Sequence, residues 1–89
     1  MIRLTVISQS REEVVLRVEG WVSGSDVTVF EEEGARLLQE TQRLVLDLSD
    51  VRFIDREGLA VLKRWSGDRL VLRGAALFLR TRLREHGLM

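Results

Sequence analysis

The chain of 89 residues contains no cysteine, a single histidine and no long apolar run. Without cysteine, disulfide bonds and thiolate metal sites are excluded. His86 cannot form a zinc site alone, because such a site needs about three or four protein ligands. No stretch approaches the roughly 18 apolar residues of a membrane-spanning helix, and the N-terminus lacks the apolar core of a signal peptide. We therefore expect a cytoplasmic domain with no cofactor, no metal and no direct membrane insertion.

The length predicts one small domain, residues 1–89, with a thin core and no large internal cavity. An apolar fraction of 45% and a charged fraction of 31% are ordinary for a soluble globular protein. The net charge is zero but unevenly placed: residues 1–50 hold five arginines against ten acids, and residues 51–89 hold nine bases against four acids. This polarity could steer a charged partner, although the two halves of a small fold interleave and their fields partly cancel.

The spacing of apolar residues predicts four strands and three helices in the order β-β-α-β-α-β-α. The expected strands are 2–8, 14–18, 43–48 and 70–72, and the expected helices are about 26–42, 56–66 and 75–86. The first two strands are expected to form a hairpin, whereas each later strand follows a right-handed crossover through a helix. The sequence therefore predicts an α/β fold with a mixed four-stranded sheet.

Some positions carry more specific expectations. Ser25 or Asp26 can cap the first helix, and Gly34 within it indicates close packing on the sheet. In the last helix, Ala76, Leu79 and Leu83 are expected to share one buried face, with Phe78 nearly opposite. Trp21 is expected in a loop after the second strand.

Residues 44–59 are the most informative segment. An apolar run typical of a strand buried on both faces leads through a turn into an amphipathic helix, so Asp55, Arg56 and Glu57 lie at the first turn of that helix. Backbone N–H groups there are unpaired and the helix dipole is positive, which suits contact with a partner. Asp55 could equally act as a cap, with Glu57 favouring the first turn. Arg56 could make paired hydrogen bonds to a carboxylate or be a solvated arginine.

The chain resembles the STAS domain family, which includes anti-sigma factor antagonists, transporter tails and small accessory subunits of lipid ABC transporters. Five segments carry the resemblance and together cover nearly the whole chain: 14–20, 44–55, 58–62, 70–74 and 83–88. The central segment is the most specific, because strand, turn and helix agree in spacing. The resemblance implies a STAS-like sheet packed with about three helices, and binding to another protein.

The sequence departs from the family where regulated antagonists are phosphorylated. In those proteins the aspartate that matches Asp55 is followed by a serine or threonine that a kinase-type anti-sigma factor modifies. Here Arg56 and Glu57 occupy these positions, and neither has a hydroxyl group. Ser23 also replaces an acidic residue that is common in the family. The resemblance therefore implies a module that is not switched by phosphorylation at the usual site.

Catalysis and nucleic-acid binding have little support in the sequence. His86 lies near the end of the last predicted helix, and no serine has an evident histidine partner. The segment 20–24 lacks the lysine and the preceding central strand of a phosphate-binding loop. Nucleic-acid-binding domains usually have a net basic charge, whereas this chain has none. We therefore predict that the protein is not an enzyme and does not bind nucleic acid.

The expected partner-binding surface combines the start of the second helix with two aromatic side chains. Its candidate residues are Asp55, Arg56, Glu57, Gly58, Leu59, Trp21 and Phe78, with Arg56 and Leu59 on the side of the helix away from the sheet. The partner is expected to be an anti-sigma factor or kinase-like regulator. The alternative is the ATPase of an ABC-type lipid transporter, with this chain as its cytoplasmic accessory subunit, and a homodimer is a third possibility.

Overall fold

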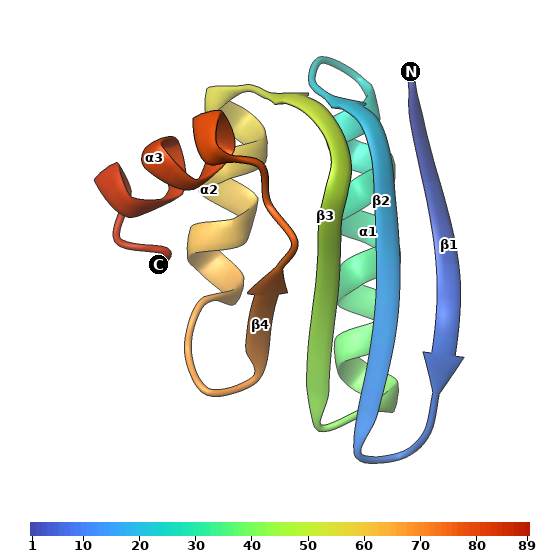
Figure 1. The fold of residues 1–89 in the computed structure, drawn as a ribbon. Helices are drawn as coiled ribbons and strands as arrows, with labels where there is room; N and C mark the ends of the chain where they lie inside the picture. The colour runs from blue at the N-terminus through green and yellow to red at the C-terminus, as the bar shows by residue number, and fades with distance from the viewer.

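The computed structural model describes residues 1–89 and contains seven elements in the predicted order (Figure 1). The strands are β1 (Ile2–Gln9), β2 (Glu13–Val22), β3 (Arg43–Ile54) and β4 (Leu70–Arg73). The helices are α1 (Asp26–Glu40), α2 (Arg56–Trp65) and α3 (Leu77–Glu85). None of the three helices combines the length and the hydrophobicity needed to cross a bilayer.

The four strands form one mixed sheet in the order β1-β2-β3-β4. The hairpin pair β1 and β2 is antiparallel, and β3 and β4 are each parallel to the strand before them. The predicted fold class is therefore confirmed. Helices α1 and α2 pack on one face of the sheet, and α3 lies beyond the end of β4, beside the last part of β3 (Figure 1). This arrangement places the start of α2 and the whole of α3 near the same end of β3.

The core lies between the sheet and helices α1 and α2. In β2 and β3, alternate apolar residues such as Leu16 and Leu46 are fully buried against the helices. Val15 and Val45 point to the other face and are also nearly buried, at the centre of the sheet. Burial of Val15 and Val45 on this second face explains the short apolar runs 14–16 and 44–46 at the centre of the two strands.

Both central strands are longer than the sequence pattern predicted. β3 continues to Ile54 rather than ending at residue 48, because the end of β3 pairs in parallel with the end of β2. β2 in turn passes through Gly20, whose φ of +95° and whose contact with the Met1 carbonyl leave no room for a side chain. Trp21 therefore lies within a strand, and its predicted position in a loop is wrong.

Helix α1 buries Val27, Phe30 and Leu37 but differs from expectation in two details. Ser25 occupies the position before the helix without making a side-chain hydrogen bond, and Asp26 is the first helical residue, with its carboxylate 3.4 Å from the Met1 ammonium, so neither predicted cap forms. Gly34 does mark close packing, but against the indole ring of Trp65 on α2 rather than against the sheet. Its role is thus to bring two helices together.

The outer elements follow the predicted pattern in part. β1 and β4 are the two edge strands of the sheet, and in β1 only Ile2 and Leu4 are half-buried. In α3, Leu79 and Leu83 are buried as predicted. Ala76 precedes the helix and is exposed, because α3 begins two residues later than expected.

Candidate partner-binding surface

Asp55 forms the junction between β3 and α2. Its Oδ1 accepts a hydrogen bond from the backbone N–H of Gly58 at 2.8 Å, and its Oδ2 accepts one from the backbone N–H of Gly24 at 3.1 Å. Its own backbone N–H donates to the carbonyl of Val22 at 3.0 Å. Asp55 therefore caps α2 and ties the loop before α1 to the start of α2.

The next two residues occupy the first turn of α2 and are exposed. Arg56 and Glu57 make no side-chain hydrogen bond or ion pair within the chain. Their charged groups are therefore free to contact another molecule. Neither side chain carries a hydroxyl that could accept a phosphate.

Gly58 and Leu59 are buried, which corrects the prediction that Leu59 faces away from the sheet. Leu59 is only 2% exposed and belongs to the core together with Leu62, one turn later. A β-carbon on Gly58 would lie 2.7 Å from Ile54. The helix is thus rotated so that residues 58 and 59 fix its position against the sheet, and only residues 56 and 57 present side chains at this turn.

Two aromatic side chains lie next to this helix start, on the sheet face opposite to α1 and α2. Trp21 on β2 and Phe53 on β3 are register partners, with ring centroids 6.0 Å apart at an angle of 55°. The following residues, Val22 and Ile54, are buried in the core, so alternation along the strands turns the two rings outward. Trp21 is 55% exposed and Phe53 42% exposed.

Helix α3 extends this apolar surface through Arg82. The guanidinium carbon of Arg82 lies 5.8 Å from the centroid of the Phe53 ring, and Nη1 donates a hydrogen bond to the carbonyl of Ile54. Phe78, four residues before Arg82, falls on the same side of α3 and is 53% exposed. We call Trp21, Phe53, Arg82 and Phe78 the aromatic strip.

The structure thus brings Trp21 and Phe78, two candidates far apart in sequence, to the same end of the sheet as Arg56. Phe53 and Arg82, which connect them, were missed. Phe53 had a detectable signal, because it alternates with the apolar Ile54 and had to face the other way. For Arg82 the sequence contains no such signal, because its contact with Phe53 depends on where α3 lies.

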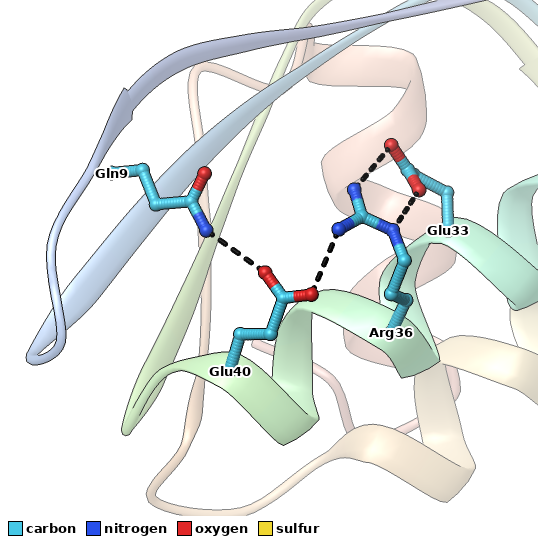
Figure 2. Close-up of polar contacts among 4 residues, drawn as sticks. All are labelled: Gln9, Glu33, Arg36 and Glu40. Atoms are coloured by element: carbon cyan, nitrogen blue, oxygen red, sulfur yellow. Dashed lines mark hydrogen bonds and ion pairs between the residues drawn. The ribbon is translucent and has the colours of Figure 1, made fainter.

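A second surface feature, not predicted, is an open groove of about 510 Å³ between the edge strand β1 and α1. Its lining residues are Ile2, Leu4, Val29, Glu32, Glu33 and Arg36. Figure 2 shows how Arg36 bridges Glu33 and Glu40, with Nε and Nη1 each 2.9 Å from a carboxylate oxygen, while Gln9 at the end of β1 donates to Glu40 at 3.1 Å. The hydrogen bond from Arg36 holds the pKa of Glu33 below its usual value. The hydrogen bond between Gln9 and Glu40 links β1 to α1.

Asp47 lies on β3 just before a shift in its register with β2. Its Oδ1 accepts hydrogen bonds from the backbone N–H of Ser49 at 3.0 Å and from the Ser49 hydroxyl at 2.7 Å. These bonds favour the charged form and hold the pKa of Asp47 below its usual value. Arg17 on β2 lies 3.9 Å away and adds a weaker attraction. The register between β2 and β3 shifts just after this pair.

The comparison with known families agrees with this architecture. The family model described as "Mlab, STAS domain" matches residues 5–89. The chain therefore belongs to the STAS domain family. A search of curated protein sequences found no match.

Solved structures of anti-sigma factor antagonists are similar over almost the whole chain. The unphosphorylated form of the antagonist SpoIIAA has a TM-score of 0.76 and 18% identity, covering 99% of this chain and 82% of that one. An anti-sigma factor antagonist from Mycobacterium paratuberculosis has a TM-score of 0.73 and 27% identity, covering 99% and 80%. The STAS domain of an antagonist from Rhodobacter sphaeroides has a TM-score of 0.61 and 23% identity, covering 82% and 86%. These similarities support the fold and the resemblance to antagonists.

Proposed function

We propose that this domain is a non-catalytic protein-interaction module of the anti-sigma factor antagonist kind, working in the cytoplasm. Its partner surface consists of the exposed residues at the start of α2, Arg56 and Glu57, together with the aromatic strip. Asp55, Gly58 and Leu59 hold this surface in place without forming its contact face.

The observation that carries the proposal is the exposure of large apolar side chains beside unpaired charges. Trp21, Phe53 and Phe78 each leave roughly half of their surface open, and Arg56 and Glu57 lack partners within the chain. Tryptophan, tyrosine and arginine are the commonest residues with a large share of binding energy in protein interfaces. A charge pair at a helix start, flanked by aromatic rings, suits a protein partner better than a small substrate.

We also propose that phosphorylation at the start of α2 does not switch the module. In the regulated antagonists that the sequence resembles, the hydroxyl residue after the aspartate accepts the phosphate. A phosphate group there would add a charge of about −1.5 to −2, whereas Arg56 and Glu57 carry opposite single charges side by side. Binding is therefore constitutive with respect to this site.

Two partner classes fit such a surface. The first is an anti-sigma factor or kinase-like regulator, and the alternative is the ATPase of an ABC-type lipid transporter. A homodimer would use the same exposed rings without a second protein.

The experiment is affinity capture from the native host with the wild-type domain and with the variant Trp21→Ala/Arg56→Glu as bait. A kinase-like regulator retained only by the wild type would support the signalling role, and a transporter ATPase so retained would support the alternative. Intact-mass measurement after incubation with the captured kinase and ATP is expected to show no added phosphate. Sedimentation of the purified domain tests the homodimer. Equal capture by both baits would rule out the proposed surface.

A further inference from the structure

The guanidinium of Arg82 makes both a ring contact and a hydrogen bond with another element of the fold. Its guanidinium lies over the Phe53 ring, and one nitrogen donates to the carbonyl of Ile54. Both contacts come from the end of β3, whereas Arg82 itself belongs to α3. The side chain is therefore held in one orientation before any partner binds.

This fixed cation has no anionic partner. The ion pairs of the chain join other arginines, including Arg17, Arg36 and Arg64, to acidic residues, and Arg82 is in none of them. Only one of its nitrogens has a hydrogen-bond acceptor, and the residue is half-buried rather than solvated. A guanidinium has five N–H donors in a rigid fork that matches a carboxylate.

We propose that Arg82 is the carboxylate-binding anchor of the partner surface, and that the partner contributes an acidic segment with large apolar side chains next to its carboxylate. This inference rests on the proposed function, because it names the chemistry that the aromatic strip recognises. The Phe53 ring beneath Arg82, the Trp21 ring that packs on Phe53 and the exposed Phe78 ring one turn before Arg82 receive the apolar side chains of the partner.

The surrounding charge favours an acidic segment. Helix α3 carries Arg80, Arg82 and Arg84 against the single acid Glu85, and Arg80 and Arg84 lie across the helix from Arg82, so they add to the field and not to the contact. At the start of α2, Arg56 offsets Glu57. The resulting excess of positive charge attracts a negatively charged segment and repels a basic one.

The test uses two synthetic amphipathic peptides of identical length and apolar content, one with glutamate and one with lysine at every polar position. Binding to the ¹⁵N-labelled domain is followed by NMR, through the Trp21 indole and Arg82 Nε–H signals. The glutamate peptide is expected to shift both signals, and the lysine peptide to shift neither. Equal binding of the two peptides, or no binding of the glutamate peptide at millimolar concentration, would overturn the proposal.

Variants of the domain distinguish a specific contact of Arg82 from non-specific attraction by positive charge. Arg82→Gln is expected to lower the affinity for the glutamate peptide at least about tenfold. Arg82→Lys is expected to lower it nearly as much, because lysine cannot stack on the ring or form two parallel hydrogen bonds to a carboxylate. The matched control Arg84→Gln removes the same charge from the same helix and is expected to change affinity less than about twofold. Equal losses of affinity for Arg82→Gln and Arg84→Gln would contradict a specific role of Arg82 as the anchor. Thermal unfolding of each variant is the control that the domain remains folded.

Two further outcomes are decisive. In the first, the captured natural partner binds the Arg82→Gln variant as tightly as wild type and fails to bind the Arg56→Glu variant. In that case Arg82 is not the anchor, while the proposed function stands. If anionic lipid vesicles of phosphatidylglycerol bind in an Arg82-dependent manner and the glutamate peptide does not, the surface recognises a lipid surface and not a protein segment, which also overturns the proposal.

Discussion

The indole ring of Trp65 on α2 occupies the space that a side chain at Gly34 on α1 would need. A β-carbon built on Gly34 would overlap several ring atoms of Trp65. The same ring packs against Phe30, with centroids 5.2 Å apart. The absence of a side chain at Gly34 thus sets the distance between α1 and the last turn of α2.

Gly34→Ala is therefore expected to lower the free energy of unfolding by about 1–3 kcal/mol, the usual cost of overpacking, although alanine is the better helix former. Denaturant unfolding measures the change. In the Trp65→Leu background the same substitution should cost much less, because the ring is gone. An equal loss in both backgrounds would show that the ring is not the cause.

The two faces of α3 are expected to respond differently to truncation. Leu83 is fully buried, so Leu83→Ala should cost about 2–5 kcal/mol of unfolding free energy. Phe78 is half exposed, and Phe78→Ala should cost far less while weakening partner binding. The comparison pairs denaturant unfolding with a binding titration. Similar destabilisation by the two variants would place Phe78 in the core.

The cap formed by Asp55 predicts a graded loss of stability. Asp55→Ala removes the acceptors for both Gly58 and Gly24 and should cost about 0.5–2 kcal/mol. Asp55→Asn keeps one side-chain oxygen for Gly58, so thermal unfolding should show an intermediate loss. Glu57→Gln is the control, since Glu57 makes no hydrogen bond in the chain, and it should change stability by less than about 0.5 kcal/mol.

The lowered pKa of Asp47 predicts acid sensitivity. Hydrogen bonds from Ser49 stabilise the charged carboxylate in the folded state, so its contribution is fully present above the unfolded pKa of about 4. This contribution is lost as the pH falls through that value and then through the lower folded pKa. Asp47→Asn should therefore reduce the dependence of unfolding free energy on pH below about 5. An unchanged slope relative to wild type would contradict the assignment, and Asp50→Asn, an exposed carboxylate nearby, serves as control.

The fold could be predicted from sequence because its signals are local. Apolar alternation around Leu16 and Leu46, and the helical spacing of Leu79 and Leu83, identify elements whose type and order the structure confirms. The boundaries were less accurate at the ends of β2 and β3. There the strands continue because they pair with each other through a bulge near Gly20, and pairing between distant segments is not visible in either segment alone.

The candidate site was predicted only in outline. The exposure of Arg56 was expected from its charge and its place at the helix start, and the exposure of Phe78 from helical phase. Leu59 was assigned to the wrong side of α2, because a single turn at a helix start leaves its rotation undefined until Gly58 packs on Ile54. Arg82 was missed because its importance arises from a contact between α3 and β3.

The central claim is that the start of α2 and the aromatic strip form one partner-binding surface. The most direct measurement is the affinity of the purified natural partner, by isothermal titration calorimetry, for Arg56→Glu, Phe53→Ala and the distant control Val6→Ala on β1. We predict that each of the first two weakens binding at least about tenfold, or about 1.4 kcal/mol, while all three variants remain folded and Val6→Ala binds as wild type. Wild-type affinity for both Arg56→Glu and Phe53→Ala would contradict the account.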